Sequence, residues 1–118
     1  MTRTERMELA KQFGTVIFER RKYWLAYQAI CDNYGTDGGV RYYAPAFDRK
    51  GNEYRIAWDT TEEWDAACRV AMLEANSCNT EAEEAEIEEL RKKYPVLPDC
   101  GDESNACDWD HPVAVYAQ

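Results

Sequence analysis

Apolar residues recur at helical spacing through the first third of the chain. From Thr4 to about Tyr34 they fall on one stripe, interrupted by Arg20: Ala10, Phe13, Ile17, Trp24, Tyr27, Cys31 and Tyr34. This period predicts an amphipathic helical segment, broken near Gly14 because glycine costs about 1 kcal/mol inside a helix. The alternative is a short strand over Thr15–Phe18, which is rich in β-branched residues. We expect the helix to end before 33–39, with Gly35 as its C-cap.

The pattern changes to alternation between Val40 and Asp59, which predicts a β-hairpin. In the second run Tyr54, Ile56 and Trp58 alternate with more polar neighbours, so one face is apolar. Residues 48–52, Asp-Arg-Lys-Gly-Asn, have the composition of a tight hairpin loop. Pro45 has no backbone donor, which favours an edge position or a bulge in the first strand.

Two further helices are expected after the hairpin. Thr60 with Glu63 and Thr80 with Glu83 both match the capping box, in which a hydroxyl and a carboxylate satisfy orphan amides at a helix start. In the first helix a core-facing stripe is expected from Trp64, Ala67, Cys68 and Ala71. In the second, Ile87, Leu90 and Tyr94 should face inward, and Pro95 should stop the helix.

The end of the chain offers one more candidate strand. Residues 96–112 are irregular and acidic, whereas Val113 to Tyr116 form a β-rich run that can add a third strand to the hairpin. The pattern as a whole predicts the α+β class: an N-terminal helical segment, an antiparallel hairpin, and two helices packed on it. A length of 118 residues is typical of a single domain.

The charge is distributed unevenly along the chain. Residues 1–58 hold ten Lys and Arg against seven Asp and Glu, whereas residues 59–118 hold four against sixteen. An acidic half repels nucleic acid and membrane surfaces and attracts basic protein surfaces. Among the few basic clusters, Arg20-Arg21-Lys22 is expected to be a solvated helix face, since three cations are few against a net charge of −9.

Cysteine and histidine supply the alternative chemistry. Without an apolar signal segment at the N-terminus, a reducing cytosol is expected, so the five cysteines should be free thiols. Cys100, Cys107 and His111 form a weak candidate zinc site with none of the short Cys-x2–4-Cys spacing, and a Cys100–Cys107 disulfide is a further alternative. The neighbouring carboxylates lack the ligand spacing of a calcium loop, and no catalytic constellation is evident.

The acidic surface carries the functional hypothesis. The carboxylates on the two predicted helices are candidates for binding a basic, nucleic-acid-binding surface of a partner protein: Glu62, Glu63, Asp65, Glu81, Glu84 and Glu88. In size and composition, though in no specific motif, the chain is similar to small acidic inhibitors that phages and mobile elements make against restriction or CRISPR nucleases. We therefore expect a non-enzymatic inhibitor without cofactor, membrane or direct nucleic-acid partner. The alternatives are a homo-oligomer built through the aromatic hairpin and a zinc module.

Overall fold

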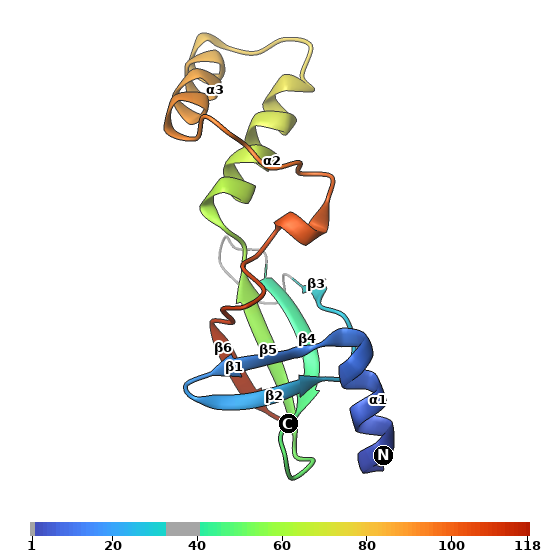
Figure 1. The fold of residues 1–118 in the computed structure, drawn as a ribbon. Helices are drawn as coiled ribbons and strands as arrows, with labels where there is room; N and C mark the ends of the chain where they lie inside the picture. The colour runs from blue at the N-terminus through green and yellow to red at the C-terminus, as the bar shows by residue number, and fades with distance from the viewer. Residues whose placement is uncertain (1, 33–40) are drawn as a thin grey trace. The chain divides into compact units, whose positions relative to one another are not determined.

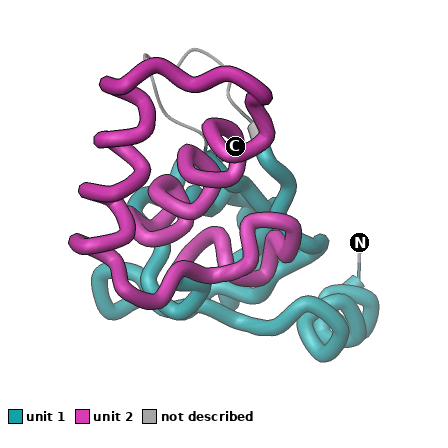
Figure 2. The backbone as a smooth tube through the Cα atoms, turned by 90° about the horizontal axis from the view of Figure 1, so that it is seen from above, with its two compact units in different colours: residues 1–59, 108–118 teal, residues 60–107 magenta. Residues whose placement is uncertain are grey.

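The computed structural model describes residues 2–32 and 41–118, so the predicted cap at Gly35 lies outside the described residues. The elements are α1 (Arg3–Phe13), β1 (Thr15–Phe18), β2 (Arg21–Leu25), β3 (Ile30–Asp32), β4 (Arg41–Phe47), β5 (Glu53–Asp59), α2 (Glu62–Glu74), α3 (Glu81–Lys93), η1 (Glu103–Asn105) and β6 (Ala114–Ala117) (Figure 1). This combination confirms the α+β class. The chain divides into two compact units, one from residues 1–59 and 108–118 and one from residues 60–107 (Figure 2). We call them the sheet unit and the helical unit.

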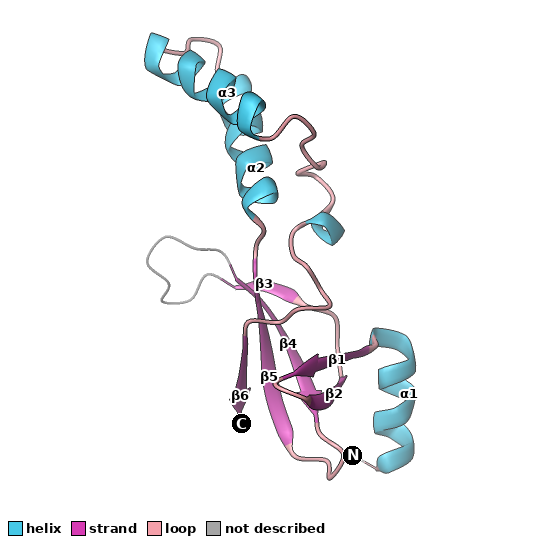
Figure 3. Ribbon diagram, turned by 60° about the vertical axis from the view of Figure 1, so that its left-hand side comes forward, coloured by secondary structure: helices cyan, strands magenta, loops and turns pink. Residues whose placement is uncertain are grey.

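The sheet unit holds one antiparallel sheet with the order β1-β2-β4-β5-β6, and β3 pairs with β4 beyond the end of β2 (Figure 3). The predicted hairpin is β4 and β5, in which Tyr42 lies opposite Trp58. The predicted third strand is also confirmed, because β6 pairs with β5 and places Val115 opposite Ile56.

The predicted helical segment from Thr4 to about Tyr34 is confirmed only as far as Phe13 and is wrong over residues 15–32. Its last residues, 33 and 34, lie outside the described residues. Thr2 caps α1 in a capping box with Glu5, and the helix ends at Gly14, whose φ is +93°. The chain then forms β1, β2 and β3, which confirms the alternative strand at Thr15–Phe18. The turn between β1 and β2 holds Glu19 and Arg20, with φ of 50° and 68°. A tight turn with two left-handed residues has the twist that a two-residue hairpin requires.

Pro45 was predicted at an edge position or a bulge, but it lies inside β4, a strand with neighbours on both sides and a continuous register with β5. β5 pairs with β4 on one side, with Pro45 opposite Arg55. On the other side the neighbouring strand changes: Leu25 of β2 is opposite Ala46, and Ile30 of β3 is opposite Tyr43. The proline therefore lies between the parts of β4 that pair with β2 and with β3. At this point its missing N–H costs the sheet no hydrogen bond.

The loop at residues 48–52 is the tight turn that its composition predicted. The Asp48 carboxylate accepts hydrogen bonds from the backbone N–H groups of Lys50 and Asn52, both at 2.9 Å, and from the Tyr54 hydroxyl at 3.0 Å. Gly51 takes a φ of +88°, which only glycine adopts without strain. Its missing side chain also admits the Arg6 guanidinium, because a Cβ there would lie 2.8 Å from Arg6 Cζ.

The core of the sheet unit lies under the alternating apolar face of the hairpin. Ile56 and Trp58 are almost fully buried, at 0% and 1% exposure. The Trp58 indole donates to the backbone oxygen of Trp109 at 3.1 Å, and the Trp109 ring meets the rings of Trp58 and Tyr42 edge-on. The β1–β2 hairpin lies across β4 and β5 and contributes further buried apolar residues (Figure 1).

One arginine joins the last strand to the hairpin. Arg41 on β4 donates to the Asp59 carboxylate on β5 at 2.7 Å and to the Tyr116 hydroxyl on β6 at 3.0 Å. The hydrogen bond that Arg41 donates to Tyr116, followed by the one it donates to Asp59, raises the pKa of Arg41 despite partial burial. Three strands are thus linked by one guanidinium that stays charged at any physiological pH.

The first helix of the helical unit, α2, begins one residue later than predicted. The cap of α2 is Thr61, whose hydroxyl accepts from the Trp64 N–H, whereas Thr60 forms a β-bridge with Cys107. The buried residues of α2 are Trp64, Ala66, Ala67, Val70 and Leu73. Ala71, expected to face inward, is exposed.

The predicted capping box of Thr80 and Glu83 is confirmed at the start of α3, which ends at Lys93 before Pro95. Ile87, Leu90 and Tyr94 are half-buried. All residues of α3 are described, and none of them is fully buried. The helix therefore lies on the surface of its unit, with its polar faces in solvent.

Candidate functional site

The net charge of the protein resides entirely in the helical unit. Residues 60–107 hold thirteen Asp and Glu against four Lys and Arg, a formal charge of −9. Residues 1–59 and 108–118 hold ten of each sign and are neutral. The chain thus has one strongly acidic unit and one balanced unit, a sharper division than the split between the two halves of the sequence.

The outer face of α3 carries three of the predicted site residues. Glu81, Glu84 and Glu88 are spaced by three and four residues, so they share one face of the helix. All three are exposed, while the half-buried residues Ile87 and Leu90 mark the opposite face. Glu88 forms an exposed pair with Lys92 at 3.4 Å, whereas Glu81 and Glu84 have no ion pair within the described residues.

Two arginines cancel other carboxylates where the helices meet. Arg69 of α2 donates to both oxygens of Glu86 at 2.9–3.2 Å, and Arg91 of α3 pairs with Glu74. The hydrogen bond with Glu86 raises the pKa of Arg69. Pairs as exposed as these contribute little to stability, because solvent and salt screen them. Their main consequence is that Glu74 and Glu86 are not available to attract a partner.

The remaining predicted residues lie at the first turn of α2. Glu62 accepts a hydrogen bond from the Tyr94 hydroxyl at 3.2 Å, and Asp65 accepts one from the Thr60 hydroxyl at 2.7 Å. Glu63 is exposed beside them. Tyr94 follows the last turn of α3, so this group is about 20 Å from Glu81 along the α3 axis. The six predicted carboxylates therefore form two groups, separated by the basic residues 91–93.

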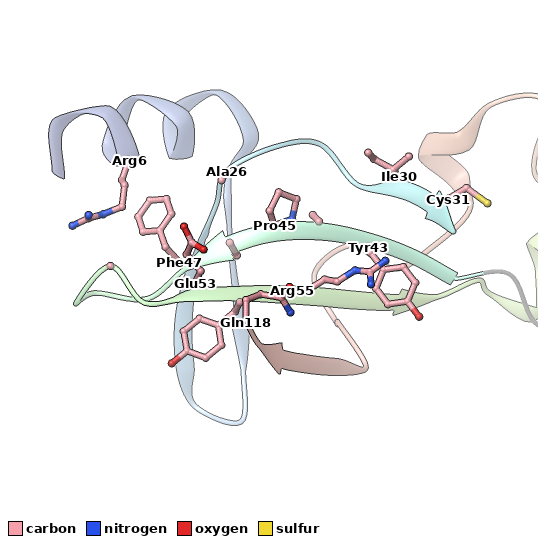
Figure 4. Close-up of a pocket in the computed structure, with 14 residues that line it drawn as sticks. Arg6, Ala26, Ile30, Cys31, Tyr43, Pro45, Phe47, Glu53, Arg55 and Gln118 are labelled. Atoms are coloured by element: carbon pink, nitrogen blue, oxygen red, sulfur yellow. The ribbon is translucent and has the colours of Figure 1, made fainter. Parts of the chain in front are cut away.

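A groove in the sheet unit was not predicted. Its volume is about 660 Å³, and its walls come from α1, β3, β4 and β5 (Figure 4). Tyr43, Pro45 and Phe47 line it from alternate positions of β4. The Arg55 guanidinium lies 3.9 Å from the Tyr43 ring centre, and that of Arg6 lies 5.5 Å from the Phe47 ring centre. The alternation of Tyr43, Pro45 and Phe47 was the available signal, but an apolar face was predicted only for the second strand of the hairpin.

The cysteine and histidine residues do not gather into one cluster, although the side chains of Cys68 and Cys100 lie within hydrogen-bonding distance of each other. All five cysteines are free thiols, as expected, so the alternative Cys100–Cys107 disulfide is absent. Burial, and then the neighbouring Cys100, raise the pKa of the Cys68 thiol. The His111 ring bonds to the Asp108 carboxylate at 2.8 Å. Within residues 2–32 and 41–118, no three potential ligands are grouped so that they would hold a metal ion.

No family model matches the sequence, and no curated protein or solved structure is significantly similar to it. Across the part of the chain that the structure describes, every helix is too short or too polar to span a bilayer. The surfaces of the two units are therefore the features that point to a function.

Proposed function

We propose that this protein is a small non-enzymatic inhibitor that binds, through its helical unit, the basic nucleic-acid-binding surface of a partner protein. The observation that supports this function most directly is the confinement of the whole net charge of −9 to residues 60–107. A charge that is concentrated on one unit produces a directed field, which speeds association with a positive groove and orients the approach.

The spacing of charge on α3 is compatible with imitation of a nucleic-acid backbone. Between Glu81 and Glu89 the helix rises about 12 Å. Four carboxylates in this stretch have no ion pair within the described residues: Glu81, Glu83, Glu84 and Glu89. That is about one charge per 3 Å of helix axis, close to the one charge per 3.4 Å of duplex axis that each DNA strand carries. A Lys- or Arg-lined groove would meet a similar density of negative charge in either case.

The proposal is tested by a pull-down from a plausible host lysate at low and high salt, using wild type and the variant Glu84→Lys/Glu88→Lys. We expect wild type to retain a nucleic-acid-processing protein at low salt and to release it at high salt. Each reversal removes an attraction of roughly 1 kcal/mol, so the variant should bind at least about 10-fold more weakly.

The matched control is Glu8→Lys/Glu19→Lys, which changes the net charge equally but lies in the neutral sheet unit. It should retain the partner nearly as well as wild type. Equal weakening by both variants would indicate a general charge effect, and unchanged affinity of Glu84→Lys/Glu88→Lys would refute the proposed surface.

The alternative of a homo-oligomer through the aromatic hairpin has less support. Tyr42 and Trp58 lie in the core at 3% and 1% exposure, so they cannot also form a contact between copies. Light scattering that shows self-association through the hairpin would restore this alternative.

A further inference from the structure

The fold brings together two basic segments that are distant in the sequence. Arg21 and Lys22 at the start of β2 lie beside Arg49 and Lys50 in the β4–β5 turn, around a hollow of about 510 Å³. All four side chains are exposed, and none has an ion pair within the described residues. Convergence of four cations on one concave surface is an arrangement suited to an anion with several charges.

Asp48, the one acidic residue that lines this hollow, already accepts hydrogen bonds from groups in its own turn. Two backbone N–H groups, the Asn52 amide and the Tyr54 hydroxyl all donate to the Asp48 carboxylate. Burial alone would raise the pKa of Asp48, but the bonds from Asn52, Tyr54 and Lys50 outweigh it and lower the pKa. Asp48 therefore stabilises the turn that contains Arg49 and Lys50, and its carboxylate is already hydrogen-bonded to donors of that turn.

Two further observations define the chemistry of the hollow. The aromatic side chains of Trp24 and Tyr54 line it, each packed on one side against a ring of the sheet unit, Phe47 and Tyr23 respectively. The Lys22 ammonium lies 5.4 Å from the Trp24 ring centre. Cations that follow a backbone, interleaved with aromatic rings that accept bases, are typical of surfaces that bind single-stranded nucleic acid.

We infer that this hollow, which we call the basic turn site, binds the phosphodiester backbone of single-stranded nucleic acid. The sequence-based expectation of no direct nucleic-acid partner depended on the overall charge of −9. That charge lies in residues 60–107, whereas the sheet unit, which holds this hollow, is neutral. The inference goes beyond the proposed function and does not depend on it.

The test measures binding of the full chain to a fluorescein-labelled oligo(dT) by anisotropy, at 50 and 200 mM salt. Four phosphate contacts predict a slope of log affinity against log salt near −2.8, from about −0.7 per contact. The affinity should then fall roughly 50-fold over this range. In Arg21→Gln/Lys22→Gln two contacts are lost, so the slope should fall to about −1.4 and the affinity at 50 mM should also fall.

The matched control is Lys92→Gln/Lys93→Gln, which removes two exposed cations from the helical unit and should keep the wild-type slope. Circular dichroism verifies that each variant is folded. The inference is overturned if wild type does not bind at 50 mM salt, or if both variants bind alike. Tighter binding of a duplex of the same length would overturn the assignment to single strands. Since no partner protein is present, failure here leaves the acidic-surface proposal intact.

Discussion

The turn between β1 and β2 is predicted to be strained, and its replacement should stabilise the sheet unit. Among the described residues, Glu19 and Arg20 are the non-glycine residues with positive φ, at 50° and 68°. A left-handed conformation costs an ordinary L-residue on the order of 1 kcal/mol or more. Asn-Gly is the pair that this kind of two-residue turn favours. The double variant Glu19→Asn/Arg20→Gly should therefore relieve most of the strain.

The expected magnitude follows from two opposing terms. Relief at the two positions contributes about 2 kcal/mol, and the greater freedom of glycine in the unfolded chain offsets about 0.5–1 kcal/mol. The double variant should gain roughly 1–1.5 kcal/mol in free energy of unfolding, which corresponds to about 4 °C in melting temperature for a domain of this size. Urea denaturation followed by circular dichroism measures the change, with an unaltered m-value as the check that compactness has not changed.

A matched pair of glycine variants isolates the strain. Lys50→Gly also replaces an exposed turn cation, but its φ is not positive. Both Lys50→Gly and Arg20→Gly carry the same cost in the unfolded state. Only Arg20→Gly also gains from relief of strain, because only Arg20 has a positive φ. We expect Lys50→Gly to lose about 0.5–1 kcal/mol and Arg20→Gly to be more stable than it by about 1 kcal/mol. If the two variants are equally destabilised, the turn is not strained and the reasoning is wrong.

Three further predictions concern the sheet unit and the cysteines. Tyr116→Phe removes the hydrogen bond that links β6 to Arg41, and urea denaturation should show a loss of about 1 kcal/mol. Because the pKa of Asp48 is lowered in the folded protein, its contribution is complete above the unfolded value of about 3.9 and is lost as the pH falls through the folded pKa. Asp48→Asn should therefore lose stability at pH 7 and show a flatter stability curve below about pH 4 than wild type; a parallel curve would contradict this. Iodoacetamide should label the exposed Cys31 before the buried Cys107, as mass spectrometry of timed samples would show.

The sequence predicted those elements whose ends carry local signals. Asp48 to Asn52 is a recognisable turn, and Thr80 with Glu83 is a recognisable cap, so the hairpin and α3 were expected where they lie. The β1–β2 hairpin lacks such a signal, because its turn is Glu19-Arg20 rather than a pair with glycine or asparagine. Because β1, β2 and β3 are short, their apolar residues happened to fall at helical spacing, and a helix was predicted. Adjacent Thr60 and Thr61 made the cap of α2 ambiguous by one residue.

The acidic positions were visible in the sequence, but their grouping was not. Whether Glu62 and Glu81 lie on one surface depends on how α2 and α3 pack, which the Tyr94–Glu62 and Arg69–Glu86 contacts determine. The basic turn site was missed for a similar reason. Arg21 and Lys22 were assigned to a helix, and nothing in the local sequence relates them to Arg49 and Lys50 across the sheet.

The helical unit has two ends that lie side by side. It begins after β5 and ends before β6, and its first and last residues, Thr60 and Cys107, form a backbone bridge, reinforced by the Thr61 N–H to Ala106 oxygen bond of 2.9 Å. An insertion with neighbouring ends places little constraint on its host, because exchanging it need not alter the strands on either side. Neighbouring ends of this kind would allow residues 60–107 to be replaced by a segment of different charge while the strands of the sheet unit stay the same. If the helical unit binds a partner as proposed, exchange of residues 60–107 alone would change that partner while the sheet stays the same.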